Sequence, residues 1–156
     1  MLLVVADTSP IRYLVQIDQI DLLARLFEEV VVADELRHAS APPKVQAFIN
    51  HAPFWLKVSP VTGTDDPALD SLDPGERSAI VLALFLKADL ILIDDRKGAS
   101  VARTKGFEIT GTLGVLDLAA RRRLIDLKDA LDRLKSTNFR YRQAIMDQLL
   151  DQQDGG

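Results

Sequence analysis

The sequence predicts an α/β fold, a three-layer α/β/α sandwich with a central parallel sheet. Short apolar runs occur near residues 2–6, 30–32 and 90–93, and two further short strands are expected at 54–58 and 107–109. Such runs are typical of strands buried on both faces. Stretches with the apolar spacing of helices alternate with these runs, and helices are the usual crossovers between parallel strands. The alternation therefore favours parallel pairing with helices on both faces of the sheet.

The predicted helices are marked by capping residues and by apolar spacing. Thr8 or Ser9 can cap the first helix, with Pro10 at its first position. The segment 73–76, Asp-Pro-Gly-Glu, is a capping-box pattern that begins a largely buried helix reaching residue 86. The residues from 59 to 73 lack periodicity and are expected to form a surface loop. Further helices are expected at 18–27, 44–51, around 101–102, 113–120, 124–134 and 141–150.

Length and composition limit the possible classes of protein. A chain of 156 residues that is 47% hydrophobic suits one domain, which we place at residues 1–150, with 151–156 as a disordered tail. The sequence has no cysteine, which excludes disulfides and thiolate metal sites and suits a cytoplasmic protein. The apolar start lacks a basic flank and a cleavage site and meets Asp7 at once, so we interpret it as a strand. A net charge of -4 argues against a uniformly basic surface but permits a local basic patch.

Four acidic residues are expected at one edge of the sheet. Asp7 follows the first strand, Asp94 and Asp95 follow the fourth, and Glu76 begins a helix. The ends of parallel strands and the starts of the following helices meet at one edge of a sheet, where ligands bind. Clustered carboxylates repel one another unless they bind cations or take up protons. Mg²⁺ and Mn²⁺ prefer such oxygens and can activate water for phosphodiester hydrolysis, so this pattern predicts a metal-dependent nuclease.

Structural roles are the alternative for the same side chains. Asp7 could be a turn residue or a helix cap, and the capping box by itself explains Glu76. One of Asp94 and Asp95 is expected to point to the site and the other into a turn or cap, with Asp95 preferred as the ligand. Hydroxyl groups could bind a carboxylate, a water or a phosphate, although capping is the commoner role, at Thr8, Ser9, Thr110 and Thr112.

Basic residues near the helices offer possible RNA contacts. The run Arg121-Arg122-Arg123 and the pair Arg140 and Arg142 could contact phosphates, although such residues on amphipathic helices usually form a solvated face. We assign possible RNA contacts to Arg96, Lys97, Arg121 and Arg122. The two histidines, His38 and His51, match no familiar zinc spacing.

Four motifs follow one another along the chain: DTSP at 7–10, LDPGE at 72–76, LIDDRKG at 92–98 and ITGTLGVL at 109–116. In this order and spacing they resemble a PIN domain, and more narrowly the DUF3368 group of prokaryotic PIN proteins, which are relatives of VapC-type toxins. The resemblance extends from about residue 2 to about residue 150. Each motif alone is weak, but their order and spacing together make coincidence a poor explanation.

This resemblance implies a PIN-like sandwich with a Mg²⁺ or Mn²⁺ ribonuclease site, frequent homodimers, and often a cognate antitoxin that inserts a segment into the site. Carried over by position, the acidic site comprises Asp7, Glu76 and Asp95, with or without Asp94. PIN domains usually carry a further Glu in the helix after the second strand. The aligned position holds His38, with Glu35 one turn earlier, so either residue substitutes or a ligand is missing.

Three hypotheses about function follow. The first is a Mg²⁺- or Mn²⁺-dependent endoribonuclease that is the toxin of a toxin-antitoxin pair. The second, motivated by His38, is a degenerate PIN module that binds RNA or a protein partner without cleavage. The third is a phosphoryl-transfer domain, because strand-end aspartates accept phosphate in other α/β folds.

Overall fold

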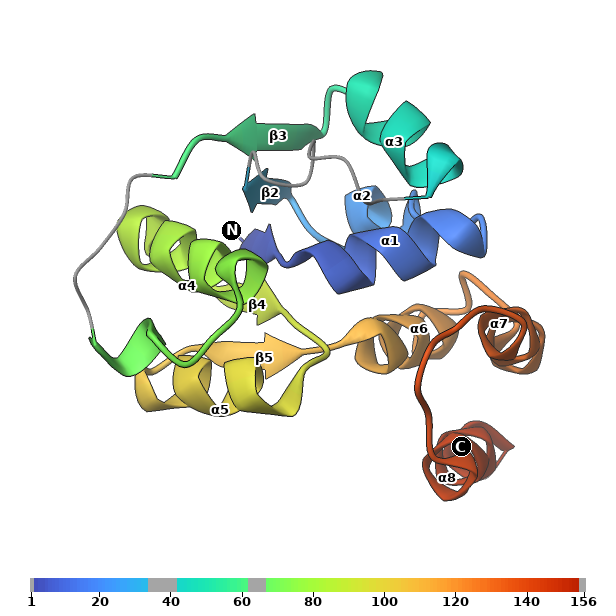
Figure 1. The fold of residues 1–156 in the computed structure, drawn as a ribbon. Coiled ribbons are helices and arrows are strands. Elements are labelled where there is room, and N and C mark those ends of the chain that lie inside the picture. The colour runs from blue at the N-terminus through green and yellow to red at the C-terminus, as the bar shows by residue number, and fades with distance from the viewer. Residues whose placement is uncertain (1, 34–41, 62–66, 155–156) are drawn as a thin grey trace.

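A five-stranded, all-parallel sheet lies at the centre of the computed structural model, which describes residues 2–33, 42–61 and 67–154. The strands stand in the order β3-β2-β1-β4-β5, and each pair of neighbours is parallel. This arrangement confirms the predicted α/β sandwich (Figure 1). The strand bounds are β1 Leu3–Ala6, β2 Glu29–Ala33, β3 Leu56–Ser59, β4 Leu90–Leu92 and β5 Glu108–Thr110.

Helices cover both faces of the sheet because alternate strand residues point to opposite sides. Val4 and Ala6 pack into the core formed with α1 (Thr8–Gln16), α2 (Leu22–Leu26), α3 (Pro43–Asn50), α6 (Thr112–Arg121) and α7 (Leu127–Lys135). Val5 packs into the second core, formed with the 3₁₀ turn Pro67–Leu69 and with α4 (Pro74–Leu86) and α5 (Arg96–Thr104). The wholly apolar strand pattern therefore reflects burial on both faces.

Two predicted helices begin later than expected because the backbone turns left-handed before them. Asp18 has a φ of 60°, and the following helix starts only at Leu22 instead of at residue 18. Arg123 has a φ of 61°, and α7 starts at Leu127 instead of at residue 124. Asp126 caps α7 by accepting a hydrogen bond from the Lys128 amide at 3.2 Å. A single residue in the left-handed conformation interrupts a helix, and the spacing of apolar residues does not predict where such a residue occurs.

The C-terminal helix α8 (Gln143–Asp154) extends beyond residue 150, so residues 151–154 of the predicted tail are helical, and residues 155 and 156 lie outside the described residues. Side chains of this last turn are tied to α6. The Gln153 amide donates a hydrogen bond to Asp117 at 3.1 Å, and Arg121 donates one to Gln152 at 3.3 Å. Met146 of α8 is fully buried in the core that α6 and α7 share. These tertiary contacts hold the last turn of α8 against α6.

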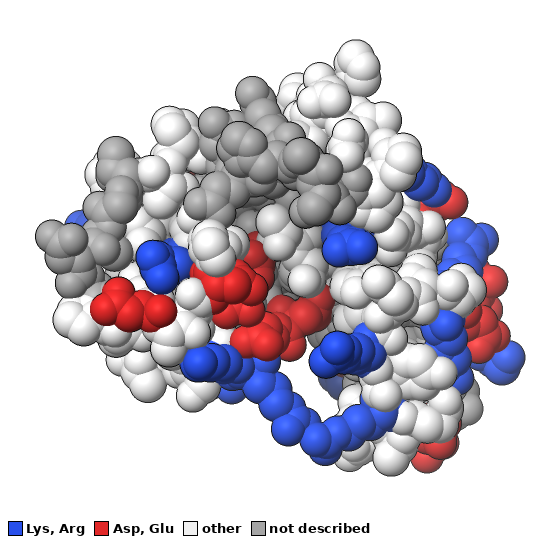
Figure 2. Space-filling view, viewed as in Figure 1, with Lys and Arg blue, Asp and Glu red and all other residues white. Residues whose placement is uncertain are grey.

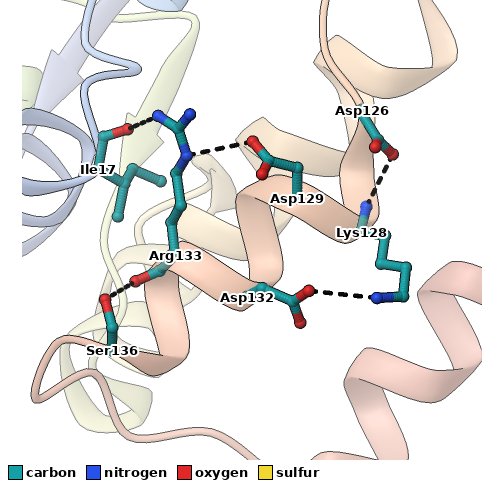
Figure 3. A network of polar contacts seen from close by, with 7 residues as sticks. All are labelled: Ile17, Asp126, Lys128, Asp129, Asp132, Arg133 and Ser136. Carbon is teal, nitrogen blue, oxygen red and sulfur yellow. Dashed lines mark hydrogen bonds and ion pairs between the residues drawn. The ribbon is translucent and has the colours of Figure 1, made fainter.

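Helix α7 is fastened to the end of α1 by one arginine. Arg133 forms an ion pair with Asp129 at 3.1 Å and donates a hydrogen bond to the Ile17 carbonyl at 3.4 Å (Figure 3). Exposed ion pairs add little stability, but the carbonyl contact joins residues 116 positions apart in the chain. The connection between α7 and α8 consequently starts from a fixed position beside α1.

The order of the strands reverses direction between β1 and β4. From β1 the chain builds outward to β2 and β3, and it then returns to the other side of β1 with β4 and β5. The Asp7 amide donates to the Leu92 carbonyl at 2.8 Å, which extends the pairing of these two strands by one residue. Ligands of open parallel sheets bind at such switch points, outside the carboxyl ends of the strands.

We predict that Met146→Ala lowers the free energy of unfolding by about 2–5 kcal/mol, because it leaves a cavity where α8 meets the core. Urea denaturation followed by circular dichroism measures this change. Gln148→Ala on the exposed side of the same helix is the control, with an expected change within about 0.5 kcal/mol. Equal losses in the two variants would show that α8 does not pack as described.

Candidate active site

Asp7 is a buried carboxylate at the switch point. The residue is 5% exposed, and its side chain caps α1, where Oδ1 accepts a hydrogen bond from the Thr8 amide at 2.8 Å. Burial raises the pKa of Asp7 to about 6, and the carboxylates of Asp73 and Asp94 contribute to the rise. The Thr8 amide opposes it by stabilising the charged form. The carboxylate of Asp7 is therefore unfavourable in its charged form unless a cation binds beside it, and otherwise it tends to take up a proton.

Glu76, in the first turn of α4, faces the same group of acids. It is buried, and burial raises its pKa to about 7, with contributions from the negative charges of Asp73, Asp95 and Asp7. A side-chain hydrogen bond with Asp73 also favours the protonated form of Glu76. The charge of Asp7 thus raises the pKa of Glu76, 69 positions away in the chain, as convergence at one edge of the sheet requires.

Asp73 is a member of this group that the sequence indicated only as a helix cap. It does cap α4, since its Oδ1 accepts a hydrogen bond from the Glu76 amide at 2.8 Å. A Cβ added to Gly75 would lie 3.5 Å from Oδ1 of Asp73 and 3.6 Å from Oδ1 of Asp7. Gly75 therefore lies against both carboxylates. The LDPGE motif contains Asp73, but its role as a helix cap concealed its second role as a member of the acidic group.

Asp94 binds the start of α6. Its Oδ1 accepts a hydrogen bond from the Thr112 amide at 2.7 Å, and its Oδ2 accepts one from the Thr112 hydroxyl at 2.8 Å. A Cβ on Gly111 would lie 2.6 Å from Oδ1 of Asp94, so this close approach requires glycine. Burial raises the pKa of Asp94, and the two Thr112 hydrogen bonds counteract part of that rise. Asp94 therefore joins the end of β4 to the start of α6 while its charge acts on Asp7.

Asp95 is more exposed than Asp94 and caps α5, where its Oδ2 accepts a hydrogen bond from the Gly98 amide at 2.9 Å. Its charge contributes to the raised pKa of Glu76. A Cβ on Gly98 would lie 3.5 Å from Cδ of Glu76, so the first turn of α5 packs against that side chain. Asp95 caps α5 and Asp94 binds Thr112 at the start of α6, and the preference for Asp95 as a metal ligand stays a prediction.

The remaining predicted residues are placed in different parts of the structure. Thr112 is buried against Asp94, whereas Ser9 and Thr110 line a groove that begins at Asp94 and Asp95. Thr8 supplies the amide that bonds Asp7. Two further predicted positions lie outside the described residues, namely Glu35 and His38.

The four residues that we predicted to contact RNA lie in two different parts of the structure. Arg96 lines the groove, and Lys97 is exposed next to it on α5. Arg121 instead forms an ion pair with Asp117 at 3.0 Å, and Arg122 is exposed where α6 ends. In Figure 2 acidic side chains gather near the centre of this face, with Lys and Arg side chains along the lower side of the acidic area. The four residues therefore do not form one patch.

The side chains of the acidic site are of the chemical type that binds Mg²⁺ or Mn²⁺. Buried carboxylates with raised pKa values are relieved by a hard cation, and the chain has no cysteine that would favour a softer metal. Over residues 2–33, 42–61 and 67–154, however, no three His, Asp or Glu side chains are placed together as a cage for an ion. Mg²⁺ commonly keeps several waters and uses one or two carboxylates, which this arrangement can supply.

The family model for DUF3368, described as a PIN domain, matches residues 3–154. The chain belongs to the PIN domain family. This finding confirms the resemblance carried by the four motifs, and PIN domains are generally nucleases that typically use divalent metal ions. Comparison with curated proteins gave no match, and comparison with solved structures gave none either. Of the helices that the structure describes, none is long and apolar enough to cross a membrane.

We predict that Asp7→Asn makes this PIN domain more stable at high pH in the presence of EDTA. Folding raises the pKa of Asp7 from 3.8 to about 6, so its stability contribution is complete below about pH 4 and is lost as the pH rises through about 6. Asparagine keeps the cap without this penalty. The variant should therefore gain about 1–3 kcal/mol over the wild type between pH 4 and pH 8.

Urea denaturation at both pH values measures this gain. Asp151→Asn, at an exposed position of α8, is the control and should show no change with pH relative to the wild type. A constant difference between Asp7→Asn and the wild type across this range would mean that Asp7 is not buried against other acids.

Proposed function

We propose that this PIN domain is a Mg²⁺- or Mn²⁺-dependent endoribonuclease that hydrolyses RNA phosphodiester bonds. One observation carries the proposal. Asp7 and Glu76, from separate elements, are both buried at the switch point with pKa values of about 6 and 7. The repulsion between these carboxylates does not stabilise the folded state, because each charged group would be more stable far from the others. Such perturbed groups collect at functional sites.

Each side chain has a proposed role. Asp7 and Glu76 lose their protons to hold the ion, with Asp95, Asp94 or both completing the acidic site. A divalent ion, when bound, lowers the pKa of water and neutralises charge that develops on the phosphate. Thr112 keeps Asp94 in position, and the Thr8 amide orients Asp7. Because protons and the metal compete for the same oxygens, metal affinity should rise from pH 6 to pH 8.

The narrower role, as the toxin of a toxin-antitoxin pair with a homodimeric toxin, rests on the family alone. A small adjacent reading frame that encodes a DNA-binding or short helical protein would support it. A PIN module that binds RNA or protein without cleavage is the second candidate. His38, at the position where PIN domains usually carry a further Glu, motivates this second candidate.

We predict that Asp7→Asn lowers RNA cleavage at least about 100-fold in Mn²⁺ at pH 8, because it removes a charge from the metal site. Excess EDTA should abolish cleavage by the wild type. A panel of structured and unstructured labelled RNAs, resolved on denaturing gels, measures the rates. Asp151→Asn is the matched control, since it makes the same chemical change at an exposed position and should keep the wild-type rate.

Calorimetric titration with Mn²⁺ separates the two candidate functions. The nuclease requires Mn²⁺ binding that Asp7→Asn weakens and that is stronger at pH 8 than at pH 6. Cleavage that persists unchanged in EDTA or in Asp7→Asn contradicts the mechanism. No Mn²⁺ binding together with retained RNA or partner binding would instead support the module that does not cleave.

A further inference from the structure

A groove of about 1200 Å³ begins at the two aspartates that follow β4 and extends to the connection between α7 and α8. We call it the basic groove and define it by Arg96, Arg103, Arg140, Tyr141 and Arg142, which line it. Arg96 and Arg103 belong to α5, whereas residues 140–142 lie just before α8. Segments far apart in the sequence thus form its two sides, and Asp94 and Asp95 of the acidic site line it as well.

The arginines of the basic groove are available to a ligand. Within the described part of the chain, none of the four forms an ion pair with a carboxylate. Arg121 and Arg133, by contrast, each form an ion pair with an aspartate of their own helix, Asp117 and Asp129. A chain of net charge -4 therefore keeps four guanidinium groups without an ion pair around one depression, which Asp94 and Asp95 also line. Arginines in such a setting are suited to phosphate oxygens.

An aromatic residue lies among these arginines. Tyr141 is 42% exposed, and its ring lies 5.8 Å from the Lys135 ammonium nitrogen. The neighbouring Phe139 is fixed, because its ring meets that of Tyr13 edge-on with centroids 5.0 Å apart. Asn138 accepts a hydrogen bond from the Tyr13 hydroxyl at 3.0 Å. Helix α1 thus holds the connection in place and leaves the ring of Tyr141 accessible.

We propose that the basic groove binds a single strand of RNA and leads it to the acidic site, with the arginines on the phosphates and a base stacked on Tyr141. This inference rests on the proposed ribonuclease function and adds the path of the substrate. Proteins that bind single strands combine a basic groove with exposed aromatic rings. A duplex has no unstacked base to offer to such a ring. Arg140 and Arg142 are positioning residues here, whereas Arg121 is engaged with α8 and Asp117.

Binding without cleavage tests the groove. The probe is a fluorescent single-stranded oligoribonucleotide of about 12 nucleotides, a length within the range of one binding domain, and anisotropy is measured in EDTA. We predict that Arg140→Gln/Arg142→Gln weakens binding at least about fivefold and reduces the salt slope by about 1.4, or about 0.7 for each lost phosphate contact. Arg25→Gln/Lys128→Gln changes the net charge equally at exposed positions outside the groove and should bind as the wild type does.

Two tyrosine variants test the stacking. Tyr141→Leu should weaken binding about fivefold or more, whereas Tyr141→Phe keeps the ring and should keep the affinity. A duplex RNA of the same sequence should bind more weakly than the single strand. Melting temperatures equal to that of the wild type establish that each variant is folded, which the exposure of residues 140–142 leads us to expect.

Several outcomes would overturn the inference. Equal affinity and equal salt slope in the two double variants would show that the groove does not carry RNA and is open to another ligand, such as an acidic protein segment. Equal binding of duplex and single strand, or of Tyr141→Leu and Tyr141→Phe, would exclude base stacking. Because EDTA prevents metal-dependent cleavage, loss of nuclease activity with retained groove-dependent binding would reject the proposed function and leave the groove intact.

Discussion

The pairing of β1 with β4 is the constraint on which the rest of this structure depends. Ala6 lies opposite Leu92 in the parallel register, and the Asp7 amide continues the pairing by donating to the Leu92 carbonyl. Residues that follow the two strands consequently begin at the same level of the sheet, on either side of the switch point. A shift of this register by one residue would turn the apolar residues of β4 to the wrong faces. The core and the acidic site therefore require the same register.

Capping and site chemistry are compatible in this group of acids. Asp7, Asp73 and Asp95 each use one carboxylate oxygen to hold the start of a helix, and that hydrogen bond also fixes the direction of the side chain. The positive N-terminal ends of helices partly offset the negative charges. Burial and mutual repulsion still raise the pKa of Asp7 and Glu76. The N-terminal ends of the helices thus reduce the repulsion among these carboxylates. The carboxylates still require a proton or a cation.

Positive charge is distributed unevenly over the molecule, although the chain is acidic overall. On α7, Lys128 and Arg133 form ion pairs with neighbouring aspartates of the same helix (Figure 3). In the basic groove the arginines come from α5 and from the connection before α8, where no acid is spaced to pair with them along a helix. Local sequence spacing thus decides which cations neutralise acids, and tertiary structure brings the others together.

The sequence by itself determined the α/β class, the strand positions to within about two residues and the presence of acids at strand ends, because these depend on local periodicity and capping. It could not predict that Asp73 joins Asp7, that both oxygens of Asp94 bind Thr112, or that α8 continues to Asp154. The run at 121–123 looked like the stronger basic signal, yet the groove is lined by Arg140 and Arg142. Those features arise from contacts between residues far apart in the chain, which only the folded sheet and its helices bring within a few ångströms.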